Sequence, residues 1–410
     1  MAQKIGYFFS SLILFILSNN SVSAQTNRNL TDTTLQINAI TTAVPFLLIT
    51  PDSRAGGMGE TGVASTADIN SMHWNASKLA FIEKKSGVSV SYIPWLRQLV
   101  DDINLSYLTG FYKVGKDQTI GASLRYFSLG NITFTDINGA VIRDYKPNEF
   151  ALDVAYARKL ADRFSGGLTL RYVFSNLTGG LNVGGANTKP GQAVAADISA
   201  MYQNTDLEVN GNPSRLGVGL NISNIGSKMS YTQTLRKDFI PTNLRLGTSY
   251  SMNIDQYNSI SFLLDFNKLL VPSPPIYQTD ATGQVVLDAN GNKVVEFGKD
   301  PNRPIASGIL GSFNDAPGGG KEELREVMYN VGFEYWYEKL FAFRAGYFHE
   351  NVTKGNRQTF SVGFGIHYNV FTFDGSYLIP TNRQNSPLNN TFRFTLGFSF
   401  DGDDGKKKVN

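Results

Sequence analysis

Apolar residues alternate with polar or small residues along most of the chain downstream of about residue 85. A period of two predicts β-strands with one apolar face and one polar face. The last segment is the clearest, because its apolar residues share one face: Phe392, Phe394, Leu396, Phe398 and Phe400. The pattern predicts fourteen strands, at Ser86–Ile93, Asp102–Tyr112, Gln118–Ser128, Asn148–Arg158, Arg163–Phe174, Ala193–Tyr202, Ser214–Asn224, Pro241–Met252, Asn258–Leu269, Glu326–Tyr337, Leu340–His349, Thr359–Tyr368, Val370–Ile379 and Thr391–Phe400.

The connections between these segments alternate in length. Those after the even-numbered strands are short, apart from Gln203–Pro213, whereas the other set is generally longer and includes Leu270–Arg325. Short turns at one end, long loops at the other and an even strand count are typical of outer-membrane barrels. We therefore predict an all-β fold, a 14-stranded antiparallel transmembrane β-barrel, rather than a soluble β-sandwich.

The first residues have the pattern of an export signal. Lys4 precedes the mostly apolar run Ile5–Leu17, and Val22-Ser23-Ala24 offers small residues for cleavage. An even strand count then returns both termini to the periplasmic side. The predicted organisation is a signal peptide at residues 1–24, an N-terminal segment with a lumen plug at 25–85, the barrel at 86–400 and a periplasmic tail at 401–410.

If the apolar faces contact lipid, the opposite faces line the lumen of the barrel. Charged residues fall on those inward faces strand after strand, as five arginines and five carboxylates: Arg125, Asp153, Arg171, Asp197, Arg245, Asp265, Glu334, Arg344, Asp374 and Arg393. A barrel of more than about eight strands is not filled by its own side chains. The Gly-, Ala- and Ser-rich segment Pro51–Ala80 is therefore the candidate plug. Balanced charge favours a filled interior with mutual pairing, and a polar conduit is the alternative.

Composition narrows the possible chemistry. A net charge of +3 is too even for a nucleic-acid-binding protein, and the absence of cysteine excludes thiolate metal sites and a cysteine nucleophile. The G-x-G-x-x-G match at Gly57–Gly62 lacks a βαβ context. In Asp288–Asn292 the glycine is misplaced for a calcium loop. We predict no catalytic, cofactor-binding or metal-binding residues, no cofactor and no enzyme activity.

The long loops carry candidate contact residues. Hairpins are expected at Asn131–Tyr145 and Gln284–Phe297, because Asn138-Gly139 and Asn290-Gly291 are strong turn signals. The first long loop holds an aromatic and aliphatic cluster, which is a candidate partner contact: Trp95, Leu96 and Leu99. The alternative is an anchor at the lipid headgroup level, where tryptophan is favoured.

The residues before the first strand resemble a known family. Phe46–Gly59, which reads FLLITPDSRAGGMG, and Ala64–Ala80, which contains Trp74-Asn75, look like the N-terminal signature of the PorV (LptO) family of type IX secretion outer-membrane proteins. That family belongs to the wider FadL-like barrel group, whose N-terminal segment forms a hatch in the lumen. Members of the wider group commonly have Asn-Pro-Ala where this chain has Asn75-Ala76-Ser77. The departure weakens any transfer of their channel function.

The resemblance implies a role in the bacterial outer membrane without catalysis. Proteins of this family collect cargo at the secretion pore, SprA or Sov, and recognise the C-terminal signal domain of the cargo. They then deliver the cargo to the surface attachment complex that contains the sortase PorU. The FadL-like alternative is diffusion of a hydrophobic small molecule through the hatch and a lateral opening. An apolar lumen pocket would indicate the transporter, whereas a filled lumen with adhesive loops would indicate the adaptor.

Overall fold

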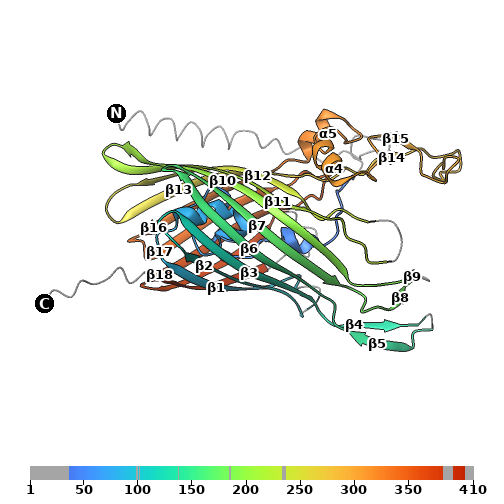
Figure 1. Cartoon of the computed structure of the whole chain (residues 1–410), viewed down its shortest axis with the longest axis horizontal. Helices are drawn as coiled ribbons and strands as arrows, with labels where there is room; N and C mark the ends of the chain where they lie inside the picture. Colours follow the sequence, from blue (N-terminus) through green and yellow to red (C-terminus); the bar gives the residue numbers. More distant parts are fainter. Residues whose placement is uncertain are drawn as a thin grey trace, which may run out of the picture. The chain divides into compact units, whose positions relative to one another are not determined.

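The computed structural model describes residues 37–97, 100, 102–136, 138–183, 186–232, 237–381 and 391–401. Within these residues, fourteen strands form a closed barrel in which each strand pairs antiparallel with its neighbours (Figure 1). The barrel strands are β1 (Ser86–Pro94), β2 (Ile103–Lys113), β3 (Gln118–Leu129), β6 (Asn148–Ala161), β7 (Phe164–Asn176), β10 (Gly191–Val209), β11 (Asn212–Gly226), β12 (Asn243–Asn253), β13 (Asn258–Leu269), β16 (Met328–Tyr337), β17 (Phe341–His349), β18 (Gln358–Tyr368), β19 (Phe371–Pro380) and β20 (Thr391–Phe400).

The predicted fold class is confirmed, and most strand boundaries agree to within a few residues. The predicted connection after the sixth barrel strand was wrong: residues Gln203–Pro213 do not form a long loop. Strand β10 continues to Val209, and the turn consists of Asn210 and Gly211, which both have positive φ, of 53° and 79°. Two such residues make the turn that suits a tight β-hairpin.

The two faces of the sheet differ as a membrane barrel requires. In β3, Ile120, Leu124 and Tyr126 point outward and are exposed, whereas Ser123 and Arg125 point inward and are buried. An exposed apolar belt is unfavourable in water and favourable in hydrocarbon. Within the described residues, no helix is long and apolar enough to span a membrane.

Long connections extend from one end of the barrel and carry their own structure. The hairpin predicted at Asn131–Tyr145 is present, as is the turn predicted at Asn290-Gly291. Asp288 accepts hydrogen bonds from the Asn290 and Asn292 amides and so closes that turn. The loop elements described are β4 (Ile132–Thr135), β5 (Val141–Tyr145), β8 (Asn182–Val183), β9 (Ala186–Asn187), β14 (Ile276–Tyr277), β15 (Val295–Phe297), α4 (Ile305–Gly311) and α5 (Gly320–Arg325).

The segment before β1 packs inside the barrel, as the blue helices among the strands show (Figure 1). Asp52 organises this segment, because its carboxylate accepts hydrogen bonds from the Ala55 amide and from Trp74 Nε1, at 2.9 and 2.7 Å. Helix α2 contacts β17 to β20, and η3 contacts β3, β6, β7 and β10. The helices of this segment are η2 (Pro45–Leu48), α2 (Ser53–Gly57), α3 (Ser71–Trp74) and η3 (Ala76–Phe81).

This segment crosses the lumen from end to end. At the long-loop end, the Asn38 amide donates to the Thr353 carbonyl at 2.8 Å. At the short-turn end, the Lys113 amide donates to the Lys85 carbonyl at 2.8 Å. The start of β1 and the end of β20 lie together at the short-turn end, as expected. The N-terminal part of the described chain does not, because the segment before β1 runs through the lumen and places residue 37 at the long-loop end. The predicted signal peptide and residues 402–410 of the predicted tail lie outside the described residues.

Candidate functional site

Every predicted lumen charge is buried, and one group forms a triad on the barrel wall. Arg171 on β7 bridges Asp153 on β6 and Asp197 on β10, with nitrogen–oxygen distances of 2.7 and 3.0 Å. The same guanidinium also donates to the side-chain oxygen of Asn224. Buried charges are tolerated when they are paired and fully hydrogen-bonded, and this triad meets that condition.

A second group joins the wall to the plug. Arg344 on β17 contacts Glu334 on the neighbouring strand β16 at 2.8 Å, and it reaches across β18 to Asp374 on β19 at 2.7 Å. Arg54 from helix α2 reaches the same Glu334 through two nitrogens, at 2.9 and 2.8 Å, and also contacts Asp68 at 2.9 Å. The bidentate pairing neutralises the charge of Arg54 and also fixes the position of α2 against the wall.

The four remaining lumen charges contact the plug. Asp265 accepts hydrogen bonds from two successive plug amides, Gly62 at 2.7 Å and Val63 at 3.0 Å. The other three are arginines, and their contacts are Arg393 with Glu60 at 3.0 Å, Arg125 with the Leu47 carbonyl at 2.7 Å, and Arg245 with the Trp74 ring at 4.9 Å. The arrangement favours a filled interior over a polar conduit, because the charges are occupied by one another and by the plug.

Sequence reasoning did not single out the charged residues of the plug itself. Arg54, Glu60 and Asp68 pair with arginines or acids, whereas Lys78 donates to the Gly62 carbonyl at 2.7 Å and to the Ser65 hydroxyl at 2.8 Å. The sequence feature that could have identified them is a few isolated charges within a segment of small residues. Such charges are expected to have partners once the segment is buried.

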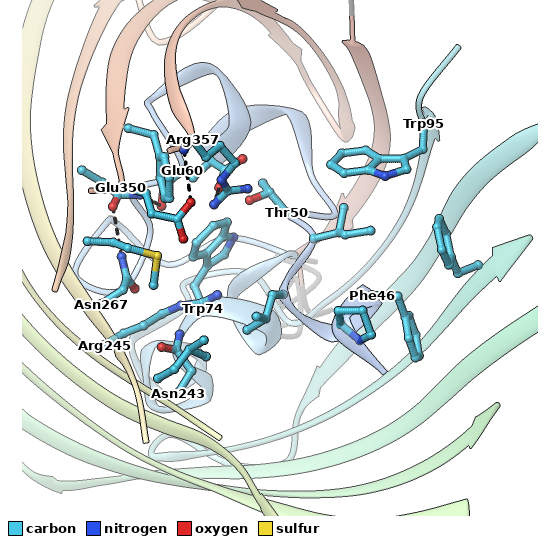
Figure 2. A pocket seen from close by; sticks show the side chains of 18 of the residues that line it. Phe46, Thr50, Glu60, Trp74, Trp95, Asn243, Arg245, Asn267, Glu350 and Arg357 are labelled. Atoms are coloured by element: carbon cyan, nitrogen blue, oxygen red, sulfur yellow. Dashed lines mark hydrogen bonds and ion pairs between the residues drawn. The ribbon is translucent and has the colours of Figure 1, made fainter. Parts of the chain in front are cut away.

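A cavity of about 460 Å³ opens above the plug, at the long-loop end of the lumen. Figure 2 shows Phe46 and Trp95 on one side, with Glu60, Glu350 and Arg357 on the other. The cavity therefore has an apolar wall facing a charged one. Its lining is Pro45, Phe46, Leu48, Ile49, Thr50, Glu60, Trp74, Trp95, Leu96, Ile103, Phe127, Leu129, Asn243, Arg245, Asn267, Leu269, Met328, Asn330, Phe348, Glu350 and Arg357.

The structure places two of the three predicted contact residues at this cavity. Trp95 is half-buried against the apolar cluster that contains Phe46, and its amide donates to the Ile103 carbonyl at 2.9 Å. Leu96 also lines the cavity, and Leu99 lies outside the described residues. Trp95 thus packs inward at the mouth of the lumen, rather than standing out from the loop.

The charged wall is held by a chain of contacts. Arg357 contacts Glu60 of the plug at 3.1 Å and covers the Phe348 ring at 3.8 Å. Burial raises the pKa of the neighbouring Glu350, against the opposing effect of Arg357. A mixed wall of this kind suits a ligand with apolar groups and a few polar ones. Within the described part of the chain, no cluster of His, Asp and Glu is arranged to hold a metal ion.

Comparison with known proteins decides the family. The family described as "Type IX secretion system protein PorV" matches residues 32–276, which is more than half of the chain. The chain belongs to the PorV family. The resemblance given by the plug sequence is thereby confirmed, and the protein is an outer-membrane β-barrel component of the type IX secretion system. The PorV family is a family of secretion components rather than of known enzymes. No curated protein matches the sequence.

Solved structures of FadL-like channels are similar in architecture. The toluene transporter TbuX of Ralstonia pickettii is 13% identical and has a TM-score of 0.44, with 86% of this chain and 98% of that chain covered. The toluene transporter TodX of Pseudomonas putida is 11% identical, with a TM-score of 0.46 and coverage of 90% and 100%. A FadL homologue of Pseudomonas aeruginosa is 11% identical, with a TM-score of 0.42 and coverage of 89% and 99%.

Proposed function

We propose that this PorV-family protein binds secreted polypeptides at the outer end of its barrel and catalyses no reaction. In this proposal it takes cargo C-terminal signal domains from the secretion pore, SprA or Sov, and passes them to the attachment complex that contains PorU. The observation that carries the proposal is the cavity at the long-loop end, which lies directly above a filled lumen. A site that is open outward and closed below can hold a partner but offers no through-path.

The cavity has the features of a protein-binding hot spot. Aromatic and aliphatic anchors that enter a partly enclosed pocket supply most of the affinity of an interface. Trp95, Phe46 and Phe127 form such an apolar wall, and Arg357 and Glu350 offer charged groups beside it. The surrounding long loops supply additional area, because a stable interface needs about 800 Å² from each partner.

Transport of a hydrophobic small molecule is the second candidate function. One observation favours it, which is that a cavity of about 460 Å³ with an apolar wall has the size of a small-molecule site. The plug argues against passage, because buried contacts connect it to the wall below the cavity. These contacts are the ion pair of Arg393 with Glu60 and the hydrogen bond that the Gly62 amide donates to Asp265. Transport would require these buried contacts to break.

Affinity capture from native membranes tests the proposal. The full-length protein should retain secreted cargo signal domains or the secretion pore. Replacing both Trp95 and Leu96 by Ala should weaken capture by about 2 kcal/mol, or roughly 30-fold, if these residues are central anchors. The matched control is Ile254→Ala, an exposed residue at the short-turn end, which should capture as well as the parent. Failure of the parent to retain any of these proteins, together with uptake of a hydrophobic compound, would support the transporter instead.

A further inference from the structure

A second cavity lies on the outside of the barrel wall. It measures about 450 Å³ and lies between the outward face of β12 and β13 and the end of the loop that connects β13 to β16. We refer to it as the outer groove. Its lining is Leu244, Leu246, Phe266, Asn267, Lys268, Phe313, Gly320, Glu323, Leu324 and Val327.

The floor of the outer groove belongs to the lipid-facing belt. Leu246 on β12 pairs in register with Phe266 on β13, and both side chains are exposed on the outward face of the barrel. Leu244 continues this face toward the long-loop end. The medium beside the floor is therefore the hydrocarbon of the outer leaflet or the boundary just above it.

A buried charge cluster fixes the loop over this floor. Lys268 pairs in register with Leu244, so its side chain leaves β13 on the outward face, yet it is buried. Its ammonium contacts Glu323 at 3.0 Å and Glu326 at 2.6 Å. Lys354 contacts the other oxygen of Glu326 at 2.9 Å. The cluster neutralises a lysine that would otherwise face lipid, and it holds helix α5 against the barrel wall.

The roof of the outer groove is apolar and open. Phe313 and Leu324 line the groove but remain 51% and 76% exposed, although both lie in a loop outside the barrel strands. Water is unfavourable in a gap lined by large apolar side chains, because a water molecule there finds few hydrogen-bond partners. An exposed apolar surface of this kind therefore indicates an apolar binding partner. Roof and floor together form an apolar slot that is continuous with the membrane-facing surface.

We propose that the outer groove holds an acyl chain of an outer-leaflet lipid, which supports the long loop on the membrane. Continuity with the lipid-facing belt identifies the occupant, because the slot begins where Leu246 and Phe266 already contact hydrocarbon. The paired Lys268 removes the charge that would exclude an acyl chain. This inference is independent of the proposed cargo binding, which uses the cavity inside the barrel.

Photo-labelling of the full-length protein in liposomes tests the proposal. The probe is a phosphatidylethanolamine with a photoactivatable diazirine in its acyl chain, and labelled peptides are mapped by mass spectrometry. Labelling should be severalfold greater at Phe313 and Leu324 than at Val141, an exposed apolar residue of β5 in another long loop. Leu246→Trp, which fills the slot, should reduce labelling of the roof severalfold, whereas Val194→Trp, on the outward face of β10 and outside the groove, should not.

A roof variant keeps the test independent of barrel assembly. Leu324→Ser changes an exposed loop residue, so the barrel should still insert, and labelling at Phe313 should fall severalfold. Labelling at Phe313 no greater than at Val141, or labelling that is unchanged in both Leu246→Trp and Leu324→Ser, would overturn the proposal. Protection of the roof by a bound protein in native membranes would overturn it as well.

Discussion

Gly346 on β17 should be intolerant of even one added methyl group, because the plug backbone lies directly against it. A Cβ at Gly346 would lie 2.1 Å from the Gly59 nitrogen and 2.1 Å from the Met58 carbonyl carbon. Ordinary contacts of a Cβ lie between 3.4 and 4 Å. The atoms in the way belong to the backbone, so a rotamer change cannot relieve the clash. In Gly346→Ala the plug must therefore move away from the wall by more than an ångström.

The size of the effect follows from the contacts that such a movement breaks. Overpacking a filled interior costs about 1–3 kcal/mol. Moving Gly59 also lengthens two hydrogen bonds, its amide to the Ser361 hydroxyl and its carbonyl to the Asn330 amide, both 2.8 Å. Each is worth about 1 kcal/mol. We expect Gly346→Ala to destabilise the seated plug by about 3–5 kcal/mol.

Planar-bilayer recording is the assay for this displacement. The parent protein should show little steady conductance, because its lumen is filled, and Gly346→Ala should show channel openings. The control is Gly166→Ala on β7, where the added Cβ meets only the flexible Leu160 side chain, at 3.3 Å. Equal conductance in the two variants, or a large stable conductance in the parent, would mean that contact with Gly346 does not hold the plug closed.

Three further predictions follow from the contacts. In this cysteine-free chain, Ile37→Cys should react with an impermeant maleimide on intact cells, because Ile37 is 76% exposed at the long-loop end, whereas Lys116→Cys should react only after permeabilisation. Arg171→Met should destabilise the folded barrel by about 3–5 kcal/mol, because two buried carboxylates lose their counter-charge. The barrel should therefore convert from its folded to its unfolded band on a denaturing gel at a lower temperature than the parent. Burial would raise the pKa of Glu322 and of Glu323, but hydrogen bonds from lysines and amides outweigh it and lower both. The two ionised glutamates therefore stabilise the loop fully above pH 4.5, the ordinary pKa of glutamate, and this stabilisation is lost as the pH falls through their lower pKa in the folded protein. Faster cleavage of the loop by pepsin at low pH would detect the loss.

The strands could be predicted from the sequence because lipid imposes a local rule. Wherever a strand crosses the bilayer, every second residue must be apolar, so the ends of β13 and β20 were found correctly. The rule stops at the membrane boundary. Strand β10 extends to Val209 through a polar stretch that needs no alternation, and its end was missed. The tight turn at Asn210-Gly211 was the remaining signal.

The interior was predictable in its composition but not in its contacts. Alternation placed the lumen charges, and the Gly- and Ala-rich stretch indicated a plug. The pairing of Arg54 with Glu334 joins residues 280 positions apart, which no local pattern encodes. The same holds for the cavity, whose opposite walls include Phe46 and Arg357. Arg245 was predicted only as a lumen charge, whereas Trp95 and Leu96 were predicted as contact residues, because an apolar cluster in a polar loop is itself a local signal.

Site-specific cross-linking on living cells is the most direct test of the central claim, that polypeptide cargo binds at the outer cavity. A photo-crosslinking amino acid, p-benzoylphenylalanine, replaces Leu96 at the cavity or Ile254 at the short-turn end. Binding of cargo at the cavity predicts a cross-linked product at Leu96 that contains a secreted cargo protein or the secretion pore, and no such product at Ile254. If Leu96 gives no polypeptide adduct in cells that are actively secreting, or the two positions give the same adducts, the claim is contradicted.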